Sequence, residues 1–288
     1  MFDTHCHLNF EAFDGRVDDV IDDAKCAGVG QIVIPGTDVK TSEKAVTIAE
    51  KYEGIYAASG IHPHHVFEIF KAQVTLETVK NFIPSLYLEK EIKKIEKLLF
   101  HSKVVAIGEV GIDRHIYQKT KYPDYIIEEE FVSFQKIILK EQIKLAIKYN
   151  KSLILHNREA RKDMFEVLQE VWDKKLEGRT VFHCCEPDPV RTIHELSLLK
   201  FAKDHKIFIG VDGDVAYNKE KQEFIKTVPL EMLVLETDSP FLSPTKQSFN
   251  EPKNLKIIAE FIARLCRETS KQIEKITTQN AKKLFSLT

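Results

Sequence analysis

The chain has 288 residues, and its 42 Lys and Arg residues nearly balance its 44 Asp and Glu residues, so the formal net charge is −2. This balance excludes a polybasic nucleic-acid coat, and 43% hydrophobic with 30% charged residues is typical of a soluble globular protein. The cysteines form no C-x-x-C pair, no stretch approaches 18 apolar residues and no leader follows Met1, so we expect a cytoplasmic protein that does not cross a membrane.

Short apolar, β-branched runs alternate with longer amphipathic stretches along the whole chain. We predict strands at residues 1–5, 31–35, 55–59, 104–107, 152–156, 180–183, 207–210 and 232–235. Helical spacing recurs between them, as in Val17, Val20, Ile21 and Ala24. Eight such βα units predict a (β/α)8 TIM barrel, which we interpret as one domain over residues 1–288.

Catalytic groups of such barrels lie at the C-terminal ends of the strands, so the residues that follow each predicted strand indicate where the site is. Most of these strands end in a histidine or a carboxylate. The residues are His5, His7, His62, Glu109, His156, His183 and Asp238. Their shared placement at one rim favours a common site over unrelated structural roles.

Imidazole and carboxylate groups are the usual ligands of divalent metal ions. Burying them together would be costly without a cation that offsets desolvation and like-charge repulsion. The six candidate ligands are His5, His7, Glu109, His156, His183 and Asp238. One tetrahedral ion cannot use all six, so we expect two divalent ions (Mg2+, Mn2+ or Zn2+) that share a carboxylate, activate a water and stabilise a departing oxygen. The spacing alone does not divide the ligands between the two ions.

Several ordered motifs resemble those of the TatD-like metal-dependent nucleases, in the metallo-dependent hydrolase superfamily of (β/α)8 barrels. They are Asp3-Thr4-His5-Cys6-His7-Leu8, Gly60-Ile61-His62-Pro63-His64, Gly108-Glu109-Val110-Gly111-Ile112-Asp113, His156-Asn157-Arg158-Glu159-Ala160, Phe182-His183-Cys184 and Leu235-Glu236-Thr237-Asp238-Ser239-Pro240. The resemblance spans essentially the whole chain. It implies a deoxyribonuclease that hydrolyses phosphodiester bonds with a metal-activated water, often from the 3′ end, and we expect single-stranded ends to be favoured.

The resemblance also implies how the metal ligands are divided. One ion would be held by His5, His7 and Asp238, and the other by His156 and His183. Glu109 would bridge the two ions, which makes it the ligand on which both depend.

Other side chains have expected roles around the ions. His62 matches a family histidine that contacts the substrate phosphate, and Asp238 is expected first as a ligand and then as a general base. Arg158 is expected to bind a phosphate oxygen, with a structural salt bridge as the alternative, and Arg114 would add positive charge near the substrate. Glu236 is expected to face the barrel interior or to orient a ligand.

The chain departs from the family pattern after His183, where Glu186 would repel a phosphodiester if it faced the site. Two long connections, 66–95 and 114–130, leave the predicted catalytic face; we expect the first to be a lid, a determinant of substrate range or an added surface helix. The second interleaves basic and aromatic side chains that suit single-stranded nucleic acid: Arg114, His115, Tyr117, Lys119, Lys121, Tyr122 and Tyr125.

Two alternatives stay open from the sequence. The same scaffold could cleave another ester or amide bond, such as an aminoacyl-nucleic-acid ester, and Glu186 and the long connections are the features that could favour this. A metal-bearing scaffold or nucleic-acid-binding module without turnover is the other alternative, against which the six intact ligands argue. The expected partner is DNA, with RNA as a further candidate, and no obligate protein partner is indicated.

Overall fold

Eight parallel strands form one sheet whose spatial order follows the sequence, from β1 to β8, in the computed structural model, which describes residues 1–74, 86–117, 125–187 and 197–288. The strands are β1 Phe2–Asp3, β2 Gln31–Pro35, β3 Ile55–Ser59, β4 Val104–Asp113, β5 Ser152–Arg158, β6 Thr180–Phe182, β7 Phe208–Val211 and β8 Leu233–Leu235. Backbone hydrogen bonds from Thr4 N to Leu235 O (3.0 Å) and from Asp238 N to His5 O (2.8 Å) join the last strand to the first. The predicted (β/α)8 barrel is confirmed.

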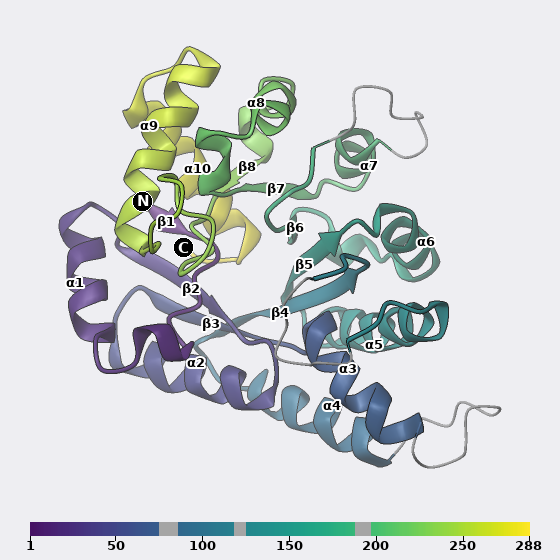
Figure 1. Cartoon of the computed structure of the whole chain (residues 1–288). Helices are drawn as coiled ribbons and strands as arrows, with labels where there is room; N and C mark the ends of the chain where they lie inside the picture. Colours follow the sequence, from purple (N-terminus) through teal and green to yellow (C-terminus); the bar gives the residue numbers. More distant parts are fainter. Residues whose placement is uncertain (75–85, 118–124, 188–196) are drawn as a thin grey trace.

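Helices follow the strands and cover the outside of the sheet (Figure 1). They are α1 Val17–Cys26, α2 Val39–Lys51, α3 Pro63–Val74, α4 Leu86–Leu98, α5 Glu129–Lys148, α6 Arg161–Val171, α7 Leu198–Asp204, α8 Lys219–Ile225, α9 Leu255–Cys266 and α10 Ser270–Leu284. None of the described helices has both the length and the apolar composition that a membrane span requires.

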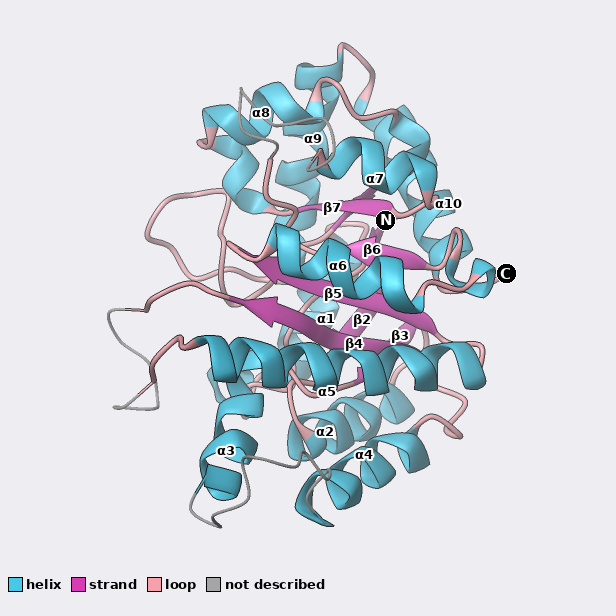
Figure 2. Ribbon diagram, turned by 90° about the vertical axis from the view of Figure 1, so that its right-hand side faces the viewer, coloured by secondary structure: helices cyan, strands magenta, loops and turns pink. Residues whose placement is uncertain are grey.

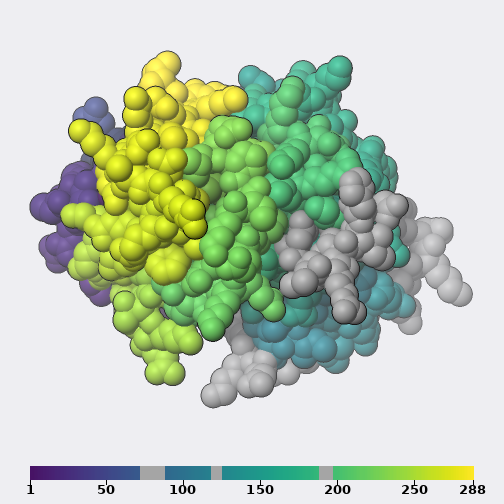
Figure 3. All heavy atoms as spheres, turned by 90° about the horizontal axis from the view of Figure 1, so that it is seen from above, coloured from purple at the N-terminus to yellow at the C-terminus, as the bar shows by residue number. Residues whose placement is uncertain are grey.

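The packing of the core shows which end of the barrel is closed. Every residue of β4 is buried, as expected for a parallel strand covered on both faces. A separate apolar cluster joins Phe2 and Phe208, the first residues of their strands, to Leu284 and Phe285 at the end of α10. The C-terminal helix therefore closes the end of the barrel at which the strands begin, and the C-terminal segments lie beside the N-terminal one (Figure 3).

The opposite end of the barrel carries the loops in which function was expected. Figure 2 shows β4 and β5 pointing toward this side, away from the C-terminus of the chain. Because strand polarity is shared in a parallel sheet, the residues that follow all eight strands meet at this end.

Several predicted boundaries differ from the structure. The first strand is only Phe2–Asp3 rather than 1–5, because the chain bends at Thr4. β4 continues to Asp113 through a register shift between Ile107 and Val110, so Glu109 lies within the strand rather than after it. The connection expected at 66–95 is largely helical, since α3 and α4 occupy its described parts. Residues 118–124, and with them Lys119, Lys121 and Tyr122, lie outside the described residues.

Candidate metal centre

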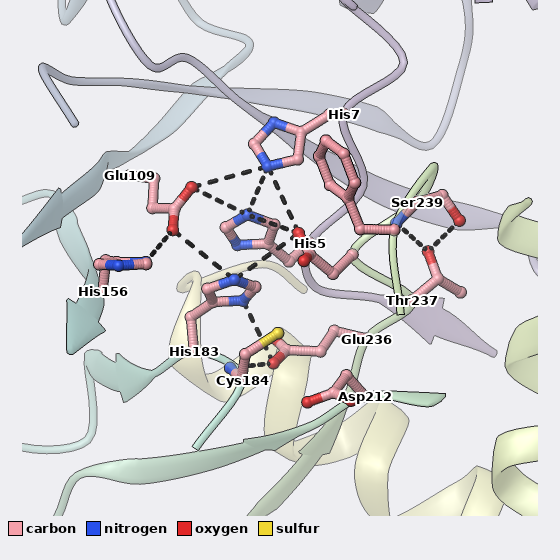
Figure 4. Close-up of polar contacts among 12 residues, drawn as sticks. His5, His7, Glu109, His156, His183, Cys184, Asp212, Glu236, Thr237 and Ser239 are labelled. Atoms are coloured by element: carbon pink, nitrogen blue, oxygen red, sulfur yellow. Dashed lines mark hydrogen bonds and ion pairs between the residues drawn. The ribbon is translucent and has the colours of Figure 1, made fainter. Parts of the chain in front are cut away.

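Five histidines and two carboxylates meet at the C-terminal ends of the strands. Figure 4 shows four of the histidines around Glu109. They come from the residues after β1, β3, β6 and β8 and from within β4 and β5, and all are buried except the partly exposed His156. The structure thus brings together all seven residues that the sequence placed at this rim: His5, His7, His62, Glu109, His156, His183 and Asp238.

Glu109 lies at the middle of the cluster. Its backbone N–H donates to Gly36 O at 2.8 Å, which fixes β4 at this point. Oε2 of Glu109 faces Nε2 of His5 at 3.5 Å and of His7 at 3.6 Å. Oε1 faces Nδ1 of His156 at 2.8 Å and Nε2 of His183 at 3.6 Å. The two oxygens of one carboxylate therefore face two different sets of imidazoles.

The first set contains His5, His7 and Asp238, whose ligand atoms all lie within 4.8 Å of one another. Oδ1 of Asp238 is 3.4 Å from Nε2 of His7 and 3.7 Å from Nε2 of His5. The two Nε2 atoms approach each other to 3.2 Å. Two imidazole lone pairs and two carboxylates converging on one point form the donor set of a divalent cation, so these residues fit a metal ion.

The second set is oriented by further carboxylates. Nε2 of His156 lies 3.0 Å from Oδ2 of Asp113, which leaves Nδ1 directed at Glu109. On the other side, Nδ1 of His183 lies 3.2 Å from Oε1 of Glu236, which leaves Nε2 directed at Glu109. Carboxylates behind metal-binding imidazoles fix their tautomer and raise their basicity.

Glycine makes the approach of β4 and β5 possible. Gly111 is paired with His156 in the parallel ladder. A Cβ atom at Gly111 would lie 1.8 Å from the carbonyl oxygen of His156, so only glycine fits between Glu109 and Asp113 at this register. Alternation along β4 then places both carboxylates on the same face, on either side of the His156 ring.

The protonation states follow from burial and from the charges in the cluster. Burial would raise the pKa of Glu109, but the surrounding imidazoles, among them the hydrogen-bonded His156, hold that pKa well below its usual value. Burial opposes the charged form of His156, yet its hydrogen bonds to Asp113 and Glu109 raise its pKa to about 10. A bound cation would supply the charge that these imidazole protons supply, so cation binding releases protons and strengthens as the pH rises.

The protonation state and the tautomer of His62 follow from its surroundings. Burial lowers its pKa well below the usual value, so the ring is neutral. Its Nδ1 accepts the backbone N–H of His64 at 3.1 Å, which places the ring proton on Nε2. Nε2 lies 3.5 Å from Oε1 of Glu109. This Nε2–H group is a hydrogen-bond donor, so it can bind a substrate oxygen but cannot ligate a cation.

The two arginines expected to bind the substrate both donate hydrogen bonds to other side chains of the protein. Arg114 donates to Oδ2 of Asp163 at 2.6 Å and to Oε1 of Glu129 at 2.7 Å, which favours a structural role for it. Arg158 donates to the hydroxyl of Tyr117 at 3.1 Å and lies over its ring at 5.0 Å, not against Asp163 or Glu159. The geometry leaves Arg158 the better candidate of the two for a phosphate.

Glu186 is the residue that would repel a nucleic-acid substrate if it faced the site. Its carboxylate accepts the backbone N–H of Glu159 at 3.1 Å, and burial raises its pKa. The side chain thus ties the loop after β6 to the loop after β5. Burial opposes the negative charge of Glu186, whereas this hydrogen bond and the nearby Arg161 favour it.

Sequence reasoning named Glu236 as a residue that orients a ligand but gave Asp113 no role. Asp113 Oδ2 also accepts the Tyr117 hydroxyl at 2.8 Å, so it connects His156 to the rim. Its position four residues after Glu109 on a strand was the available signal, because period-two alternation puts both on one face.

The comparisons with known proteins show the family to which the chain belongs. The family model described as TatD related DNase matches residues 2–286. The chain belongs to the TatD-related DNase family. An uncharacterized metal-dependent hydrolase, YabD of Bacillus subtilis, is 33% identical over 291 residues, covering 100% of this chain and 99% of YabD.

Two further comparisons extend this assignment. The protein named 3′-5′ ssDNA/RNA exonuclease TatD, of Cronobacter sakazakii, is 28% identical over 294 residues, covering 99% of this chain and 97% of that protein. The crystal structure of YJJV, a TatD homologue from Escherichia coli, superposes with a TM-score of 0.77 at 26% identity, covering 100% and 98% of the two chains. This TatD-family protein is accordingly a metal-dependent hydrolase that acts on ester bonds.

Proposed function

We propose that the chain is a two-metal deoxyribonuclease that shortens single-stranded DNA ends in the 3′ to 5′ direction. One observation carries the two-metal part of the proposal, namely that the oxygens of Glu109 face separate groups of imidazoles. A carboxylate in this position can bind one cation with each oxygen, as in enzymes with paired ions about 3.5 to 4 Å apart.

The ligands would be divided as the faces of Glu109 suggest. His5, His7 and Asp238 would hold one ion. His156 and His183 both face Oε1 of Glu109 and would hold the other, although Nε2 of His183 also lies 3.7 Å from Oδ1 of Asp238. Glu109 would bind both ions. When bound, divalent ions at this position supply an activated water and neutralise the charge on the departing oxygen. The donor set of imidazoles and carboxylates is compatible with zinc, manganese or magnesium.

The remaining roles belong to protein groups. The Nε2–H of His62 would donate to a non-bridging oxygen of the phosphodiester, since its Nδ1 is occupied by the His64 amide. Asp238 would accept a proton from the attacking water through the oxygen that does not face His7, because a carboxylate has acceptor capacity beyond one ligand bond. Arg158 would neutralise a second phosphate oxygen from the rim.

The choice of substrate draws on the comparisons. The Cronobacter relative is named for 3′-5′ exonuclease action on single-stranded DNA and RNA, and it matches this chain over nearly its whole length at 28% identity. That name supports the direction of digestion and a polynucleotide substrate, with RNA as an additional substrate to be compared.

The test is digestion of single-stranded DNA labelled at its 5′ end or its 3′ end by metal-stripped protein, with magnesium, manganese or zinc restored. The proposal predicts a stepwise ladder from the 5′ label, early release of a mononucleotide from the 3′ label, and neither product with Glu109→Ala. Folding of the variant is checked by its circular dichroism spectrum. Metal binding without any shortening of DNA would refute the nuclease proposal and would direct attention to aminoacyl esters.

A further inference from the structure

Large aromatic side chains are exposed on the loops that follow β7 and β8. Phe241 is 51% exposed, Phe249 is 46% exposed and Tyr217 is 37% exposed. These loops lie at the C-terminal end of the barrel, where Asp238 is found. The exposed rings therefore share a rim with the metal centre.

Phe241 lies next to a proposed metal ligand. The ring of Phe10 stacks on the ring of His7, with centroids 4.2 Å apart and an angle of 15° between the planes. Phe241 meets both rings edge-on, at 6.1 Å from Phe10 and 6.4 Å from His7. Phe10 and His7 support one part of the Phe241 ring, and half of its surface faces solvent beside the centre.

The backbone of Phe241 is held in place. Its N–H donates to Asp238 O at 2.9 Å, and its carbonyl accepts Nδ2 of Asn250 at 2.6 Å. The same Asn250 side chain also donates to Thr237 O at 2.8 Å. The loop that carries this ring is already ordered in the folded protein. Binding a flat partner to the ring therefore loses little conformational entropy.

A cation lies further along the same rim. Lys246 stands over the ring of Tyr217 at 5.0 Å and makes no ion pair with any residue that the structure describes. The loops that carry them are packed together, since a Cβ atom at Gly213 would lie 2.2 Å from Leu242 O. We call Phe10, Phe241, Tyr217 and Lys246 the aromatic rim.

We propose that the aromatic rim is a subsite for unpaired nucleotides, in which Phe241 stacks a nucleobase of the strand whose phosphodiester is cut. This inference rests on the proposed function and deepens it. Aromatic rings stack any base through its π-face, and a lysine beside them pairs with the phosphate backbone. A paired base keeps its face against its neighbours in the duplex, so the subsite selects single-stranded ends.

The test compares two oligonucleotides of equal length, one normal and one with abasic residues at its last two 3′ positions, cut by the wild type and by Phe241→Ala. The wild type is expected to prefer the normal strand, and Phe241→Ala to lose about 5- to 150-fold in kcat/KM on that strand only. Phe100→Ala is the matched control. Phe100 is also exposed, at 72%, but it precedes β4 at the other end of the barrel.

A binding measurement separates this inference from the nuclease proposal. Fluorescence anisotropy of a labelled single strand with metal-stripped protein is expected to weaken about 5- to 150-fold in Phe241→Ala and to stay unchanged in Phe100→Ala. Lys246→Met should reduce the slope of log Kd against log salt by about 0.7.

Each outcome decides between the two proposals. Equal loss on the normal and abasic strands, or unchanged binding by Phe241→Ala, would overturn the stacking subsite while wild-type digestion keeps the nuclease proposal. Tight, Phe241-dependent binding without any wild-type digestion would overturn the nuclease proposal, and with it the claim that the stacked base belongs to a cut strand.

Discussion

Lys221 offers a test of how the β7 side of the site is held. It is 4% exposed, and its Nζ lies 2.6 Å from Oδ2 of Asp212 and 2.5 Å from Oδ1 of Asp214. Asp212 is fully buried. Lys221→Met keeps the length of the side chain but leaves these two carboxylates without their cation, at the start of the loop that carries Tyr217.

The magnitude follows from this burial. Removing one partner of a buried ion pair costs about 3 to 5 kcal/mol, because the charge that remains is uncompensated. An unfolding entropy of about 2.1 cal/mol/K for each of the 288 residues gives about 0.6 kcal/mol/K. The melting temperature of Lys221→Met at pH 7 should therefore fall by about 5 to 8 °C.

The loss should depend on pH with a definite sign. Burial opposes the charged form of Asp212, but Lys221 and the Asp214 amide hold its pKa at about 2. Because this pKa is below the unfolded value, the stabilisation is present above about pH 4 and is lost as the pH falls through 2. In Lys221→Met, burial raises the pKa of Asp212. Protonation of Asp212 at pH 3 to 4 should therefore remove the cost of burying its charge and reduce the difference in melting temperature from the wild type.

Scanning calorimetry at pH 7, 5 and 3.5 measures this effect. Lys226→Met is the matched control, because Lys226 makes an exposed pair with Glu223 and should change the melting temperature by less than about 1 °C. Adding Asp212→Asn to Lys221→Met should recover part of the loss. A fall of less than 2 °C at pH 7, or an equal deficit at every pH, would refute the reasoning.

Three further changes test the surroundings of the metal centre. Glu236→Gln weakens the interaction with Nδ1 of His183 and should reduce the affinity for divalent metal by about 10- to 100-fold. Calorimetric titration of the stripped protein measures this affinity, and a change under twofold would contradict the role of Glu236. Asp113→Asn should reduce metal affinity similarly while the melting temperature stays within a few degrees, because Asn can still accept from His156; unchanged affinity would make Asp113 purely structural. Arg114→Met should cost about 1 kcal/mol of stability and leave KM for an oligonucleotide unchanged, since its partners are Glu129 and Asp163; a large rise in KM would restore it as a substrate residue.

Much of the fold was predictable because its signals are local. Apolar β-branched runs located β2 and β3 at their observed bounds, and strand polarity placed the polar residues at one end. The extension of β4 to Asp113 was not predictable, because it depends on pairing with β5 beyond a register shift. Local pattern says little about such long-range pairing.

The candidate site was predictable in its members but not in its geometry. Strand ends supplied the histidines and carboxylates, yet only the structure gives each oxygen of Glu109 its own set of imidazoles. The role of Arg114 was not predictable. Its position near the site suggests a substrate contact, and nothing in the local sequence indicates that its guanidinium donates to Asp163, far along the chain. The exposure of Phe241 likewise depends on how the β8 loop packs, which no local pattern encodes.

The most direct test of the two-metal nuclease restores metal to the stripped protein in measured equivalents and follows shortening of end-labelled single-stranded DNA. We expect no shortening at zero equivalents, a rate that reaches its maximum at two equivalents per chain, and no rate at any loading in Glu109→Gln. A maximum already reached at one equivalent, shortening in excess chelator, or turnover by Glu109→Gln would contradict the two-metal centre bridged by Glu109.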